Sequence, residues 1–152
     1  MRDRFENFAA MILELNRCVQ KIKEIELRDF NLKGTQGMCL YYLYSNPKGL
    51  TPQELTNLVK EDKAAISRAV KYLHDNQFIS IDSFENDSKR NYRQPLFLTD
   101  KGKELAVQIN KRIDEVLSLS DNGITEEERN VMYLSLEKIN HNLTKYISEK
   151  CE

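Results

Sequence analysis

The stretch from about residue 63 to residue 75 carries side chains that could contact DNA from one side of a helix. Its apolar residues recur at helical spacing and predict a buried side, formed by Ile66, Ala69, Val70 and Leu73. Arginine can hold guanine O6 and N7 with two hydrogen bonds, serine can donate to a base or phosphate, and a small alanine can contact a thymine methyl. Lysines at the edges suit phosphates. The outward side consists of Lys63, Ala64, Ser67, Arg68 and Lys71. It is either the surface that enters the major groove of DNA or an ordinary solvated face of the helix.

A second basic group follows in a predicted β-hairpin. Strands are predicted at 78–82 and 96–98, with Pro95 tolerated at an edge position, and a polar loop from 85 to 91 between them. Arginine in a minor groove is favoured by its negative potential, most where the groove is narrow. Asp87 could orient a guanidinium or simply form the turn. The candidate groove-binding cations are Lys89, Arg90 and Arg93, and the sequence leaves open whether Arg90 or Arg93 enters.

Two helix-start signals position the first of these groups. Thr51-Pro52-Gln53-Glu54 combines a capping box with proline at the first helical position, which predicts a short helix at about 52–59. Asp62 can cap the helix that follows. Thr51 and Gln53 are candidates for contacts with the DNA backbone.

Four further helices are predicted around this segment. An apolar stripe predicts a helix at about 5–28, and a segment at 35–45 is apolar nearly all round, as in a core helix. Thr99 caps a helix to about Leu119, and a capping box at Thr125 starts the last one. The order is that of a helix-turn-helix followed by a wing. We expect a mainly α fold with a small β-hairpin wing (α+β): a winged helix-turn-helix with flanking dimerisation helices.

The chain of 152 residues suits one continuous domain. We expect residues 31–102 to form the DNA-binding region, and residues 1–30 and 103–152 a helical dimerisation region. The stripe on the first helix (Phe5, Phe8, Ile12, Leu15, Val19, Ile22) is too long for one small domain to cover, which favours a homodimer.

Composition excludes several other classes. The net charge of −1 gives no support to a nucleic-acid partner by itself. Three cysteines without metal-ligand spacing indicate reduced thiols, and two isolated histidines indicate no metal site. No nucleotide-binding or hydrolase motif is present, so we predict neither an enzyme nor a cofactor. Without a signal sequence or an apolar run of membrane length, we expect a cytoplasmic protein with no membrane partner.

From Leu32 to Leu105 the chain resembles the multiple antibiotic resistance regulator (MarR) family of winged-helix repressors. The likeness rests on residues 32–36, 50–55, 62–70 and 78–79, the Asp87, Lys89 and Arg90 wing, and residues 98–102. The resemblance implies a dimer on a palindromic operator and release of double-stranded DNA by a small molecule or an oxidant. It also implies that Arg68 is the recognition arginine and that Asp87 and Arg90 form the wing pair.

The resemblance raises three further points. Cys18 lies in the helix where some oxidant-sensing members carry a reactive cysteine; alternatively, it packs as a small apolar residue. Tyrosines 41, 42 and 44 could line a pocket for a small aromatic ligand or could be core residues, so the effector pocket is unknown. Lys60 and Gln77 replace glycines usual in the family; a left-handed non-glycine costs roughly 1 kcal/mol, which favours a rearranged corner.

One alternative function shares the same fold. A winged-helix module can bind another protein through its wing and helix instead of DNA. Binding to DNA that weakens steeply with salt would distinguish the two, because phosphate neutralisation releases counterions.

Overall fold

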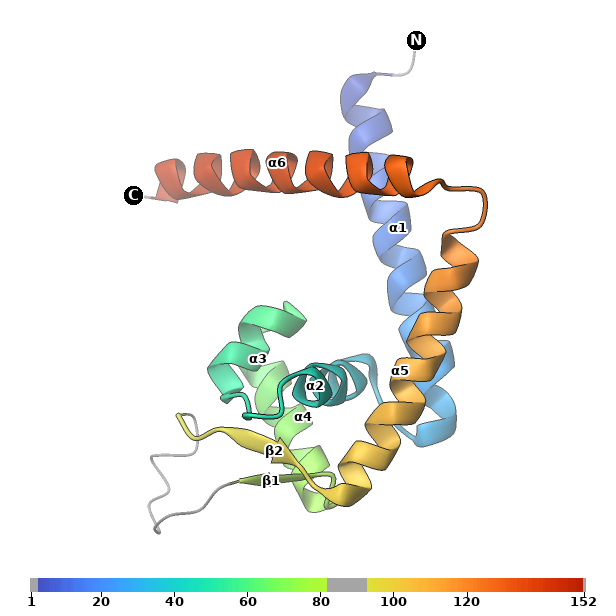
Figure 1. The fold of residues 1–152 in the computed structure, drawn as a ribbon. Helices are drawn as coiled ribbons and strands as arrows, with labels where there is room; N and C mark the ends of the chain where they lie inside the picture. The colour runs from blue at the N-terminus through green and yellow to red at the C-terminus, as the bar shows by residue number, and fades with distance from the viewer. Residues whose placement is uncertain (1–2, 82–92, 152) are drawn as a thin grey trace. The chain divides into compact units, whose positions relative to one another are not determined.

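The computed structural model describes residues 3–81 and 93–151. These residues form helices and one antiparallel pair of strands, as predicted (Figure 1). Contacts divide the chain into a unit up to Ile113 and a unit from Asp114 onward. No helix within the described ranges is long and apolar enough to cross a membrane.

The first unit begins with a long helix and a tight corner. Helix α1 spans Arg4–Leu27 and continues into a 3-10 turn, η1, at Arg28–Phe30. Asn31 then adopts left-handed backbone angles, with φ 56° and ψ 34°, and ends the turn. The sequence pattern predicted α1 but not this corner, which brings the chain back towards the core.

Helix α2, Gly34–Ser45, is the centre of the core (Figure 1). Its start is fixed by Gln36, whose side chain accepts a hydrogen bond from the backbone N–H of Lys33 at 2.8 Å. Gly37 is required here, because a Cβ would lie 2.4 Å from a methyl of Leu27. Cys39 and Leu40 are fully buried, which confirms the prediction of a core helix.

Helices α3, Pro52–Val59, and α4, Lys63–Asp75, form the helix-turn-helix. The predicted capping box is present: Glu54 N–H donates to Thr51 Oγ1 at 3.2 Å, and Thr51 N–H donates to Glu54 Oε2 at 2.8 Å. Asp62 caps α4 by accepting from Ala65 N–H at 2.7 Å. Both helix starts agree with the sequence because each signal is local.

The turns after these two helices correct one expectation. Lys60 and Gln77 keep the left-handed conformation, at φ 62° and 63°, so the corner is not rearranged. Lys60 N–H closes α3 by donating to Thr56 O at 3.1 Å. After α4, the left-handed Gln77 lets Phe78 N–H donate to Leu73 O at 2.9 Å, which closes the end of that helix. The chain therefore accepts the backbone cost at both positions.

The hairpin consists of β1, Ile79–Ile81, and β2, Leu96–Leu98, paired antiparallel with Ile79 opposite Leu98. Leu96 also exchanges two backbone hydrogen bonds with Leu50, at 2.8 and 3.2 Å. This isolated bridge, which sequence patterns did not reveal, joins the first residue of β2 to the residue before the Thr51 cap of α3.

Helix α5, Asp100–Ser120, leads out of the first unit. In the second unit, α6 spans Glu126–Cys151 and begins with the predicted capping box, in which Glu128 N–H donates to Thr125 Oγ1 at 3.2 Å. Arg129 and Asp121 approach to 3.1 Å across the turn between the two helices. None of the described residues of α6 is buried.

Candidate nucleic-acid interface

Helix α4 has the two sides that its sequence predicted. Ile66, Ala69 and Leu73 are buried in the core, and Val70 is half-buried against it. The opposite side is exposed at all five candidate positions: Lys63, Ala64, Ser67, Arg68 and Lys71. The polar side chains proposed for base contact therefore stand on one accessible helix surface, which we call the α4 surface.

Charges on the α4 surface differ in how far they are already paired. Among the described residues Arg68 makes no ion pair, so its guanidinium can take up two new hydrogen bonds. Lys71 donates to Asp75 Oδ2 at 2.7 Å, and this bond holds the pKa of the Asp75 carboxyl below its ordinary value. A phosphate at Lys71 would have to share the ammonium with Asp75.

The start of α3 is less open to DNA than its sequence suggested. The Thr51 hydroxyl donates to Glu54 Oε2 at 3.0 Å and accepts from Glu54 N–H, so both of its roles are in use. Hydrogen bonds from the Thr51 backbone and side chain lower the pKa of Glu54 and favour a carboxylate at this helix end. Gln53 is exposed. Of the two candidate backbone contacts, Gln53 has the more accessible side chain.

The wing candidates are only partly within the described structure. Asp87, Lys89 and Arg90 lie outside the described residues. Arg93 is exposed, three residues before β2.

The three thiols differ in environment. Cys39 is buried, and burial raises the pKa of its thiol to about 12. Cys18 is exposed on α1, and its Sγ lies 4.0 Å from Glu14 Oε1. Both cations that flank Cys18 are paired with carboxylates, Arg17 with Glu14 at 2.6 Å and Lys21 with Glu24 at 3.0 Å. Cys151 is exposed on α6.

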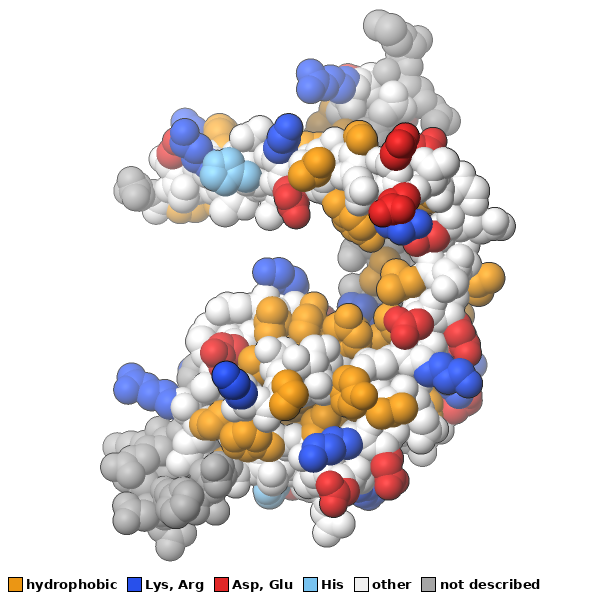
Figure 2. Space-filling model, viewed as in Figure 1, with side chains coloured by type: hydrophobic (Ala, Val, Ile, Leu, Met, Phe, Trp, Pro, Cys, Tyr) orange, Lys and Arg blue, Asp and Glu red, His pale blue; other side chains and the backbone are white. Residues whose placement is uncertain are grey.

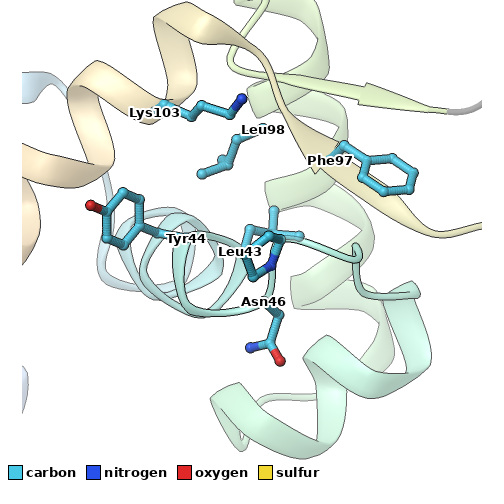
Figure 3. Close-up of a pocket in the computed structure, with 7 residues that line it drawn as sticks. Leu43, Tyr44, Asn46, Phe97, Leu98 and Lys103 are labelled. Carbon is cyan, nitrogen blue, oxygen red and sulfur yellow. The ribbon is translucent and has the colours of Figure 1, made fainter.

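A groove of about 580 Å³ lies in the first unit, between α2, β2 and α5. Hydrophobic side chains gather on the face of the unit that Figure 2 shows. In Figure 3 the Lys103 ammonium of α5 extends over Leu98 of β2, with Leu43 and Tyr44 of α2 below and to the side. The groove is lined by Leu43, Tyr44, Asn46, Pro47, Phe97, Leu98 and Lys103. Of the three α2 tyrosines, only Tyr44 lines it; Tyr42 packs against the core.

The structure adds contacts at the C-terminal end of α4 that sequence reasoning did not single out. The Thr99 hydroxyl donates to Gln77 O at 2.7 Å, and the Lys101 ammonium donates to Asn76 O at 2.9 Å. Gly102 permits this approach, because a Cβ would lie 1.9 Å from Phe78 O. The sequence carried a signal for it only in the Thr99–Gly102 segment of the family resemblance.

Comparison with known proteins shows which proteins this chain resembles. No protein-family model matches the chain. The HTH-type transcriptional regulator YybA of Bacillus subtilis is 28% identical over 127 residues, which cover 84% of this chain and 82% of that protein. The HTH-type transcriptional regulator TcaR of Staphylococcus aureus is 26% identical over 146 residues, 95% of this chain and 89% of that protein.

The solved structures that resemble this chain are also transcription regulators. A MarR family regulator from Listeria monocytogenes, in complex with a 26-mer DNA, superposes with a TM-score of 0.76 at 27% identity and covers 95% of this chain and 91% of its own. A MarR protein from Peptoclostridium difficile has a TM-score of 0.78 at 25% identity, over 96% and 93% of the two chains. The predicted resemblance and the winged-helix fold are confirmed. These relatives are transcription regulators, not enzymes, and they do not favour a protein-binding module.

Proposed function

We propose that this winged-helix chain, similar to MarR-family regulators, is a dimeric sequence-specific DNA-binding regulator that acts in the cytoplasm as a repressor on a palindromic operator. One observation carries the proposal most directly: the side chains of the α4 surface are all exposed while the opposite side of the same helix is in the core. Arg68 is the residue to which we assign base contact, and Lys63 and Lys71 are assigned to phosphates.

The operator can be found by selecting bound sequences from random duplex DNA. Affinity for the selected sequence should fall steeply with salt, because bound cations displace condensed counterions. Arg68→Ala should weaken specific binding by about 1–3 kcal/mol, or roughly 5- to 150-fold. Lys111→Ala, which removes an exposed cation from α5, is the matched control and should bind normally. Equal affinity of Arg68→Ala and the unchanged protein would refute the assignment.

Release by a small molecule is the second part of the proposal. The groove beside Lys103 supports it, because its volume of about 580 Å³ is within the usual range for ligand sites and its lining is mostly apolar with one cation. A small aromatic anion has the matching chemistry. Screening such compounds for release of the selected DNA tests this part. Release that survives Lys103→Met would place the ligand elsewhere.

Oxidation is the alternative trigger, and Cys18 is its candidate sensor. Treating the protein with peroxide and measuring DNA affinity tests this idea. Binding that is unchanged by peroxide, or lost equally in Cys18→Ser, would remove Cys18 from the proposal.

A further inference from the structure

The C-terminal half of α4 is held by two other segments of the first unit. From one side, Tyr72 Oη donates to the carbonyl of Asn31, in the corner at residues 28–31, at 3.0 Å. From the other side, Thr99 and Lys101 at the start of α5 donate to the carbonyls of Gln77 and Asn76. A cation near these last carbonyls is also favoured by the helix dipole.

Lys101 is a packing contact as well as a charge. Its ammonium lies 4.7 Å from the centre of the Phe78 ring. The backbone contributes a further contact between the same two segments, since Thr99 N–H donates to Phe78 O at 3.1 Å. The end of α4 and the start of α5 are therefore joined by side chains and backbone together.

Arg112 joins α5 to the corner at residues 28–31. From α5 its guanidinium donates to Glu26 O at 2.8 Å and to Asp29 Oδ2 at 3.0 Å. It also lies 4.5 Å from the centre of the Phe30 ring. The Arg112 side chain is 31% exposed and that of Asp29 is 69% exposed, so the bond to the Glu26 carbonyl is the better shielded of the two. Arg112 follows Lys101 by 11 residues, about 16 Å along the helix at 1.5 Å per residue.

These contacts close a ring. Helix α4 is bonded to the corner through Tyr72, the corner to α5 through Arg112, and α5 back to α4 through Thr99 and Lys101. In a closed ring, rotation of α4 against α5 must break a bond on at least one side, whereas an open chain of contacts would allow it.

We propose that Tyr72 and Arg112 are positioning residues for DNA recognition, which fix the orientation of α4 relative to α5. This inference rests on the proposed function, because it concerns the helix assigned to the major groove. Misorientation of α4 would disturb base contacts, which need defined geometry, more than phosphate contacts, which tolerate displacement.

The test compares Tyr72→Phe, Arg112→Gln and the double variant on the selected sequence and on random duplex DNA. Each single variant should lose about 3- to 10-fold in affinity for the selected sequence, the usual size for one or two hydrogen bonds. Affinity for random DNA and its salt dependence should stay unchanged. The double variant should lose less than the product of the single losses, because either break opens the same ring.

Two matched controls accompany these variants. Tyr41→Phe removes a hydroxyl on α2 that makes no hydrogen bond within the described part of the chain and does not line the groove, and should bind as the unchanged protein does. Arg112→Lys keeps the charge but not the forked donor geometry, and should lose as much as Arg112→Gln.

The outcomes separate this inference from the proposed function. If the unchanged protein selects no sequence, the proposed function fails. If it does, and Arg68→Ala loses affinity, then normal binding by Tyr72→Phe overturns the ring alone, as do losses that multiply in the double variant. Should Arg112→Gln unfold at the assay temperature, the Tyr72→Phe measurement decides.

Discussion

At the residue scale, Lys60 and Gln77 have left-handed backbone angles that glycine adopts at far lower cost. Their φ values are 62° and 63°, and both side chains are exposed. We predict that Lys60→Gly and Gln77→Gly each raise the free energy of unfolding by about 0.5–1 kcal/mol. The relief of left-handed strain should exceed the extra entropy that glycine gives the unfolded chain. Urea unfolding measures the change.

Asn31→Gly is the graded control for that prediction. Asn31 is also left-handed, at φ 56°, but asparagine tolerates this region better than lysine or glutamine. Its gain should be smaller than those at Lys60 and Gln77. Equal or lower stability of Lys60→Gly would mean that the Lys60 side chain contributes more to the native state than its exposure indicates.

The left-handed residues show where sequence reasoning stops at this scale. The free-energy cost of a left-handed backbone at Lys60 and Gln77 could be predicted from residue type. Whether the chain would keep that backbone conformation could not. It depends on whether surrounding contacts outweigh about 1 kcal/mol. At Gln77 they do: its carbonyl accepts from Thr99 at 2.7 Å, across 22 residues of sequence. Local patterns carry no record of such a partner.

At the element scale, the helices could be predicted because their start signals are local. The capping boxes at Thr51 and Thr125 and the cap at Asp62 all form as expected. The turn at Arg28–Phe30 and the bridge between Leu50 and Leu96 were missed, because each depends on chain segments that meet only after folding. The contacts of Tyr72 and Arg112 could not be predicted for the same reason, because their partners are 41 and more than 80 residues away in the sequence.

The two capping boxes predict a dependence of stability on pH. Backbone and side-chain hydrogen bonds from the threonines lower the pKa of Glu54 and Glu128 below the ordinary 4.5. A lowered folded-state pKa gives stability that is present above the ordinary value and is lost as pH falls through the folded value. The Glu54→Gln, Glu128→Gln double variant should therefore melt below the unchanged protein at pH 7, and the gap should narrow towards pH 3.

Thermal unfolding followed by circular dichroism at both pH values measures that gap. Glu115→Gln, at an exposed position of α5, is the control. The difference in melting temperature between this variant and the unchanged protein should be the same at pH 7 and pH 3. A gap between the double variant and the unchanged protein that stays constant from pH 7 to pH 3 would show that the two carboxylates do not stabilise their helices by charge.

At the scale of the whole molecule, the single chain leaves an apolar stripe uncovered. The six residues of the α1 stripe are each at least 37% exposed, and α6 adds exposed apolar residues of its own. An exposed apolar stripe of this length on one helix marks an association site. A second copy with twofold symmetry would cover it, and such a dimer suits a palindromic operator whose half-sites lie about 34 Å apart, one turn of DNA.

Changing the centre of that stripe should separate the two chains. Ile12→Glu would bury a charge in the proposed interface, so the mass from light scattering at micromolar concentration should fall from that of two chains to that of one, 17.8 kDa. Affinity for the palindrome should then fall by about 100-fold or more, because each half-site is bound without its linked neighbour. Ala10→Glu, exposed on the opposite side of α1, is the matched control and should remain dimeric. A mass of one chain for the unchanged protein would contradict the dimer, and DNA recognition would then have to come from single subunits.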